Sequence, residues 1–154
     1  MIIETILGNL TEFQVEDIEI DRVWLDHDML AKPHQKLKSE GGMELAVSLP
    51  HGEHLFWGAV LYKDETKIVV IYLVPEDVIE IRPNVYMERV RAAFNIENMH
   101  HPAYLYDDHI LLPYDSIIEK MIQSMGLASS IQKKPLTGVR ANHTHGHGHN
   151  HYHP

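Results

Sequence analysis

The chain has no cysteine among its 154 residues. Disulfide scaffolds, thiolate zinc sites, thiolate catalysis and dithiol redox relays are therefore excluded. Any metal that the chain binds must be held by nitrogen and oxygen ligands. Such ligands suit nickel, zinc and copper(II), and they disfavour copper(I) and iron–sulfur clusters.

Basic residues are also scarce. Lys and Arg number 13 against 22 Asp and Glu, which gives a formal net charge of -9 with histidine neutral. Neither nucleic acid nor an anionic membrane is an expected partner, because both are bound chiefly through clusters of Lys and Arg. The acidic balance is compatible with the binding of cations.

Long apolar runs are missing as well. No stretch of the sequence approaches the roughly 18 apolar residues that a membrane-spanning helix requires. Residues 1–9 lack the basic region that opens a secretory signal. We therefore expect a cytoplasmic protein.

The common signatures of hydrolytic and phosphoryl-transfer enzymes are absent. The sequence contains no HExxH zinc motif, no Gly-x-Ser-x-Gly elbow and no phosphate-binding loop. We expect a protein without enzymatic turnover. The enzymatic alternative is a hydrolytic metal site built from His100, His101 and Glu97.

What the sequence does contain is a histidine-rich carboxyl end. Its histidines alternate with small or polar residues, so side chains two positions apart point the same way in an extended segment and can close on one ion. Neutral imidazole is the commonest protein ligand for borderline divalent metals. We expect a flexible metal-binding tail. A purification tag is the alternative, but tags usually lack such varied spacers. The histidines are His143, His145, His147, His149, His151 and His153.

The first half of the chain has the pattern of short strands. The apolar run at residues 68–74 predicts a central strand buried on both faces. The glycines of residues 39–42 predict a hairpin. Six strands without a helix predict a small all-β sandwich or barrel-like domain over residues 1–74. The expected strands are residues 2–7, 18–24, 36–38, 43–49, 59–62 and 67–72.

Residues 75–132 predict a ferredoxin-like β-α-β-β-α-β domain, and residues 133–154 predict a linker followed by the tail. Together the two domains make an α+β protein. Asn84 is expected to cap the first helix and Asp115 the second, with Gly126 ending the latter. The expected strands are residues 78–81, 103–106, 109–112 and 127–131. The expected apolar stripe of the first helix is Tyr86, Val90, Ala93 and Phe94, and the expected buried positions of the second helix are Ile117, Ile118, Met121, Ile122 and Met125.

The loop after the first helix carries a second candidate metal ligand, His100. A histidine in such a loop is usually a solvent-facing residue without a role. The tail changes this expectation, because one imidazole on a folded domain and several on a flexible arm can complete one coordination shell. His101 is a candidate for an additional ligand.

Several segments resemble the UreE family, the urease accessory nickel metallochaperones. The resemblance covers nearly the whole chain and is strongest at residues 94–100, Phe-Asn-Ile-Glu-Asn-Met-His, which match the family's helix end and Gly-Asn-Arg-His motif. Glu97 and Met99 depart from that motif, and Ala59 replaces a usual Asp. The other similar segments are residues 2–9, 36–50, 58–62, 111–115 and 118–126, and the His-rich tail is also common in the family.

The resemblance implies a specific role. Members are homodimers in which the motif histidine of each subunit, here His100, meets its mate across the dimer axis and binds Ni²⁺, with tail histidines joining. The family delivers nickel to the urease apoenzyme through a complex with an accessory GTPase. The resemblance also implies that the β-rich domain at residues 1–74 is a peptide- or partner-binding domain. The same imidazoles would also bind Zn²⁺ or Cu²⁺, so nickel preference does not follow from the ligands. The alternative function is a general zinc or nickel storage or sensing protein that binds metal only through its tail.

Overall fold

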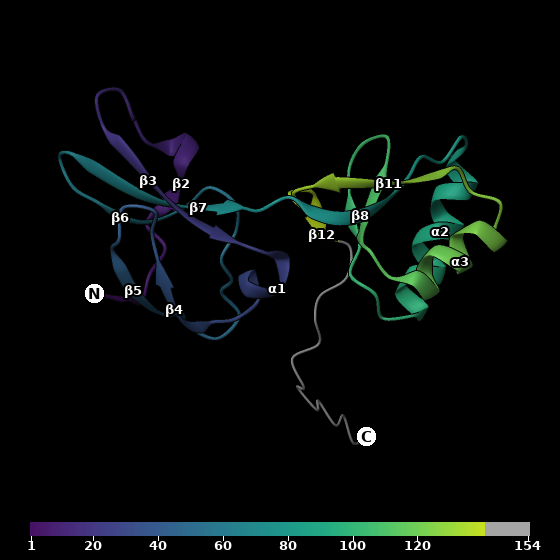
Figure 1. The fold of residues 1–154 in the computed structure, drawn as a ribbon, viewed down its shortest axis with the longest axis horizontal. Coiled ribbons are helices and arrows are strands. Elements are labelled where there is room, and N and C mark those ends of the chain that lie inside the picture. The colour runs from purple at the N-terminus through teal and green to yellow at the C-terminus, as the bar shows by residue number, and fades with distance from the viewer. Residues whose placement is uncertain (141–154) are drawn as a thin grey trace, which may run out of the picture. The chain divides into compact units, whose positions relative to one another are not determined.

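The computed structural model describes residues 1–140. The chain divides into two compact units, one spanning Met1–Glu76 and a second that begins at Asp77. Together the two units make an α+β protein, and the helices α2 and α3 both belong to the second unit (Figure 1). None of the helices in the described part is long and apolar enough to cross a membrane.

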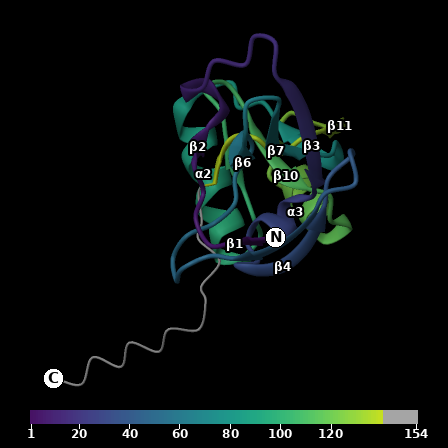
Figure 2. The same ribbon diagram turned by 90° about the vertical axis from the view of Figure 1, so that its left-hand side faces the viewer.

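The first unit is a two-sheet sandwich. Its smaller sheet has the strand order β1-β5-β4 and its larger sheet the order β2-β6-β7-β3, which Figure 2 shows side by side in that sequence. No barrel closes within the described residues, because the two sheets remain separate. The bounds are β1 Ile2–Ile3, β2 Gly8–Asn9, η1 Leu10–Glu12, β3 Glu19–Leu25, α1 His27–Leu30, β4 His34–Lys38, β5 Glu44–Ser48, β6 Ala59–Lys63 and β7 Lys67–Leu73.

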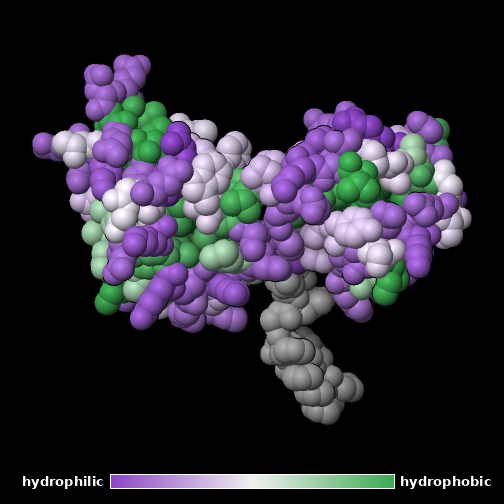
Figure 3. Space-filling view, viewed as in Figure 1, coloured by the Kyte–Doolittle hydropathy of each residue, from purple (hydrophilic) through white to green (hydrophobic). Residues whose placement is uncertain are grey.

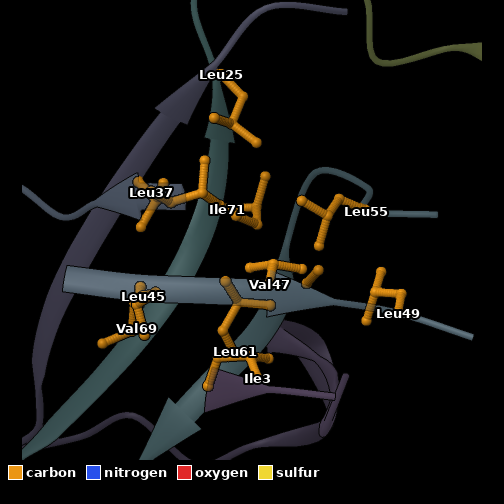
Figure 4. Packing of buried hydrophobic residues seen from close by; sticks show 12 residues of the cluster. Ile3, Leu25, Leu37, Leu45, Val47, Leu49, Leu55, Leu61, Val69 and Ile71 are labelled. Carbon is orange, nitrogen blue, oxygen red and sulfur yellow. The ribbon is translucent and has the colours of Figure 1, made fainter. Parts of the chain in front are cut away.

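The core of this unit lies between the sheets. Leu45 and Val47 of β5 face Val69 and Ile71 of β7 (Figure 4). The prediction of a doubly buried central strand is confirmed at β7, whose Ile68 and Val70 pack on the other face against a second apolar cluster. The predicted hairpin around the two glycines is also confirmed, as β4 and β5.

The expected first strand, residues 2–7, was wrong. Only residues 2 and 3 form a strand there, β1, which pairs with β5, and the next strand, β2, begins at Gly8 and pairs with β6 in the other sheet. The apolar run marks residues that are buried or paired, but it carries no sign of the point at which the chain leaves one sheet for the other.

The buried carboxylate of Asp21, in β3 of the larger sheet, binds the turn between β4 and β5 of the smaller sheet. The Ser39 hydroxyl donates to Asp21 Oδ2 at 2.6 Å, and the Gly41 amide donates to Oδ1 at 2.8 Å. Lys67 Nζ lies 3.5 Å from Oδ2. Burial acts to raise the pKa of Asp21, but these three partners together outweigh it and lower the pKa below its usual value.

We expect Asp21→Asn to lower the free energy of unfolding at pH 7 by about 1–3 kcal/mol, because an amide cannot accept all three contacts. A carboxylate whose pKa is lowered by folding contributes stability above its unfolded pKa and loses that contribution as the pH falls through its folded pKa. The difference between Asp21→Asn and the unchanged chain should therefore shrink in urea unfolding below about pH 4. The exposed Glu16→Gln change, as control, should shift stability by less than about 0.5 kcal/mol. A pH-independent difference for Asp21→Asn would contradict the argument.

The second unit has the predicted ferredoxin-like order β8-α2-β9-β10-α3-β11, in a sheet ordered β11-β8-β10-β9-β12. The helices cover the same face of the sheet (Figure 1), with Ile96 and Ile122 packed against Ile79 and Ile110. Asp115 caps α3 as predicted, and Gly126 ends it at a φ of 71°. The bounds are β8 Glu76–Ile81, α2 Tyr86–Asn98, β9 Tyr104–Leu105, β10 Ile110–Pro113, α3 Ser116–Ser124, β11 Ser129–Lys134 and β12 Val139–Arg140.

Three details of this unit differ from prediction. Asn84 does not cap α2, which begins one residue later after Val85, and the Glu88 side chain instead accepts the Asn84 amide at 2.8 Å. Ile117 was expected to be buried, yet it is 66% exposed. β11 runs to Lys134, and β12 follows it, so residues expected to form a linker belong to the sheet.

Candidate metal centre

His100 is the second residue beyond α2 and directly follows Met99, the C-cap of that helix. Two backbone hydrogen bonds close the end of the helix. The His100 amide donates to Glu97 O at 3.0 Å, and the His101 amide donates to Ile96 O at 3.4 Å. This pairing is the Schellman arrangement, which requires a left-handed residue at the position of His100. His100 indeed has a φ of 53°, and Glu97, where the family motif has Gly, lies within the last turn of the helix.

The left-handed backbone is unusual for His100. Glycine normally fills this position because its lack of Cβ removes the steric cost, although histidine tolerates it better than most residues. The imidazole is exposed, and within residues 1–140 its ring makes no hydrogen bond. An exposed ring without a partner on a strained, well-anchored helix end is available to an incoming ion.

His101 is held differently. Its Nε2 lies 2.8 Å from the carbonyl oxygen of Pro113, so this nitrogen must carry the proton that it donates. The carboxylate of Asp115 accepts the amides of Ile118 and Ile117, and these hydrogen bonds lower its pKa. The charge of His101 lowers the pKa of Asp115 further. In this arrangement Nε2 of His101 is not a free ligand.

The strand that precedes the histidine-rich segment, β12, lies beside β9, the strand that follows His100 in the chain. β12 pairs antiparallel with β9, placing Val139 opposite Leu105 and Arg140 opposite Tyr104. Tyr104 follows His100 by four residues, and antiparallel pairing makes the chain at Arg140 run in the direction of His100. The six tail histidines, His143 to His153, lie outside the described residues.

One face of α2 is apolar and exposed. Tyr86, Met87, Val90 and Phe94 fall within about 100° of each other around the helix axis and are 79, 62, 41 and 67% exposed. The predicted apolar stripe therefore exists, but it faces away from the sheet, because Ala92 and Ile96 form the buried face. Figure 3 shows hydrophobic patches within the mostly hydrophilic surface of the chain.

The other polar clusters are structural. His27 Nδ1 lies 2.7 Å from Glu76 Oε1, and His109 Nδ1 lies 2.6 Å from Asp108 Oδ1. Lys134 and Arg82 bind the buried Glu80. Across residues 1–140 no three His, Asp or Glu side chains come together as a group able to hold a metal ion.

Two family models match the chain. The model described as UreE urease accessory protein, C-terminal domain, matches residues 76–154, and its N-terminal counterpart matches residues 3–73. The chain belongs to the UreE urease accessory protein family. Similar members of the UreE family are the urease accessory proteins of Bacillus cereus, 37% identical over 82% of this chain and 86% of the relative, and of Geobacillus kaustophilus, 31% identical over 87% and 90%. A third, from Flavobacterium johnsoniae, is 32% identical over 82% and 77%.

Membership of the UreE family was predicted from sequence and is confirmed. Sequence reasoning missed two features of the site. The left-handed conformation of His100 was missed because the position holds no glycine, the residue that usually indicates such a conformation. The pairing of Val139 and Arg140 with β9 escaped notice because two residues are too few to show a strand period.

Proposed function

We propose that this UreE family member is a nickel metallochaperone. It binds Ni²⁺ through the His100 imidazoles of two subunits at a homodimer interface, adds histidines of the tail, and delivers the ion for assembly of the urease metallocentre. The observation that carries the proposal is the exposed imidazole of His100 at the end of α2, beside an unpartnered apolar stripe.

The apolar stripe on α2 supports a second copy of this chain as its partner. Isolated exposed apolar residues are ordinary, but a contiguous stripe along a helix is typical of an interaction surface. In a two-fold dimer each helix meets the same surface of its mate, so residues near the axis meet their own copies. His100 lies two residues beyond the helix that bears Phe94, and a two-fold contact along this stripe would bring the two imidazoles toward one ion.

Two imidazoles leave positions open on a four- to six-coordinate ion. Tail histidines, water or a residue of the receiving protein must fill them. An incomplete shell suits delivery, because the ion is held and yet can pass on by ligand exchange. Protons compete with the metal at each imidazole, so binding weakens in acid. Zn²⁺ and Cu²⁺ would compete for the same nitrogens.

The partners follow from the same role. The urease apoenzyme and the accessory GTPase complex are the expected recipients of the nickel, and the transfer takes place in the cytoplasm. The chaperone itself turns over no substrate. The first unit, with its boundary near residue 74, is the proposed partner-binding domain, and the second, with the tail, is the metal domain. Exposed aromatic residues support this division: Trp24 and Trp57 are 43 and 51% exposed, and both rings contact Tyr72.

Nickel calorimetry on the chain truncated after Arg140 tests the function. This cut keeps β12 and removes all six tail histidines. We expect about one tight nickel per two truncated chains, and we expect His100→Ala to abolish it. His34→Ala, which changes another exposed histidine, is the matched control and should bind like the parent.

The alternative, a storage or sensing protein, gives the opposite pattern. If truncation alone removes all tight binding and His100→Ala in the full chain changes nothing, only the tail binds metal. The dimer site and the delivery role would then be rejected together. A purification tag predicts the same loss of nickel binding on truncation. Whether the natural protein, without any tag, carries these histidines distinguishes a tag from a storage or sensing protein.

A further inference from the structure

Tyr106 holds the chain immediately before the histidine-rich segment. Its hydroxyl oxygen accepts the amide of Thr137 at 3.0 Å and that of Gly138 at 2.7 Å. The same oxygen lies 3.2 Å from Thr137 Oγ1. A phenol has two acceptor positions and one proton, so all three contacts can be satisfied at once if the phenol donates to the threonine.

The Tyr106 ring is itself fixed. It stacks on the imidazole of His109 with the centroids 4.4 Å apart and the planes 7° from parallel. Its amide donates to the carbonyl of His109 at 3.0 Å, across the turn between β9 and β10. Asp108 in turn holds the His109 ring through Nδ1. The hydroxyl is therefore a fixed point on the folded domain.

Gly138 fits against this tyrosine with no space to spare. A Cβ at this position would stand 2.6 Å from Tyr106 Cε2 and 2.7 Å from the carbonyl oxygen of Leu105. Real Cβ atoms essentially never come so close to backbone atoms, so any side chain at position 138 must displace the strand. Glycine is required here for close approach and not for an unusual backbone angle.

Beyond this point the chain pairs with β9. Arg140, opposite Tyr104, also places its guanidinium carbon 6.0 Å from the centroid of that ring. The first tail histidine, His143, comes three residues later, and His100 lies four residues before Tyr104. The Tyr106–Gly138 contact thus holds the chain just before β12, the last strand that the structure describes ahead of the tail.

We propose that Tyr106 and Gly138 form a latch that positions the tail histidines over the metal at His100. This inference rests on the proposed nickel function and adds positioning residues to it. With the latch closed, His143 lies three positions along the chain from the anchored Arg140. With it open, the next fixed side chain is the buried Leu136, seven residues from His143. Effective concentration falls as roughly the −3/2 power of tether length, which gives a loss of about fourfold.

The test is nickel competition calorimetry, with nickel chloride as the probe, on the full-length chain and on the chain truncated after Arg140. Tyr106→Phe keeps the stacked ring and removes only the hydroxyl, and Gly138→Ala forces the strand away. We expect each change to weaken nickel binding about fourfold in the full chain. Neither should alter the affinity of the truncated chain, where there is no tail to position. Tyr62→Phe, which removes a hydroxyl bonded to Asp64 in the first unit, is the matched control and should bind as the parent does.

The comparison separates a latch from a merely structural role. A tyrosine needed only for folding would weaken binding in the truncated chain too, and that result would overturn the proposal. The proposal would also be overturned if truncation weakened nickel binding but Tyr106→Phe and Gly138→Ala bound nickel in the full chain as tightly as the parent. If truncation has no effect at all, the tail supplies no ligand and the latch is rejected, while His100→Ala still decides the nickel site separately. X-ray absorption should count fewer imidazoles on nickel in both variants than in the parent.

Discussion

With its metal removed, a chain carrying glycine in place of His100 is expected to be more stable than one carrying alanine, by about 1 kcal/mol. Both changes should abolish tight nickel binding. The reason is the φ of 53° at this position, which places any Cβ close to the backbone and which glycine adopts without that cost. Urea unfolding of the metal-free variants measures the difference, and calorimetry measures the binding.

Lys120 provides the control for this pair. It is exposed in the interior of α3, where the backbone is right-handed and alanine is the best helix former. There glycine should be less stable than alanine by about 1 kcal/mol, the opposite sign. If the glycine variant were also less stable than the alanine variant at position 100, the backbone of His100 would carry no strain, and the Schellman ending would not constrain it.

The strain at His100 supports its proposed role as a metal ligand. Residues in the left-handed region persist where the surrounding structure holds them, and they concentrate at functional sites. Glycine at position 100 would end α2 at lower cost and would serve stability alone. Histidine there exchanges some stability for an imidazole fixed at the end of a rigid helix.

Local patterns predicted much of this fold. The apolar run of β7, the glycine turn between β4 and β5, and the Asp115 cap of α3 each depend on a few neighbouring residues, and all three were confirmed. The orientation of α2 could not be obtained in that way. Its sequence is apolar on two faces, and periodicity does not say whether Phe94 or Ile96 faces the sheet.

The candidate site was predictable to a similar extent. The alternating tail and the motif ending at His100 are visible in sequence, the latter through the family resemblance. The geometry that joins them was not visible. β12 has two residues, and its place at the edge of β9 depends on Tyr106, more than thirty positions earlier in the chain. Contacts of that separation leave no periodic trace.

Phe94→Glu is expected to convert the dimer to monomers and to remove the tight nickel site with it. Phe94 is 67% exposed in the single chain, so glutamate there should leave the fold intact, as circular dichroism can check. In a two-fold interface the change places two like charges in a surface that dimerisation would bury. An uncompensated buried charge costs about 3–5 kcal/mol, which weakens the dimer at least about 100-fold. Analytical ultracentrifugation measures the dissociation constant, and calorimetry of the same samples measures nickel.

Ile117→Glu is the matched control for that change. Ile117 lies on α3 in the same unit, is also a large apolar residue, and is 66% exposed, so its replacement alters charge and surface hydrophobicity to the same degree. It should remain a dimer and bind nickel tightly, because it lies outside the α2 stripe that leads to His100. A Phe94→Glu protein that stays dimeric would show that another surface makes the dimer. A monomer that kept its tight nickel would show instead that one His100 suffices, and the symmetric two-histidine centre would have to be abandoned.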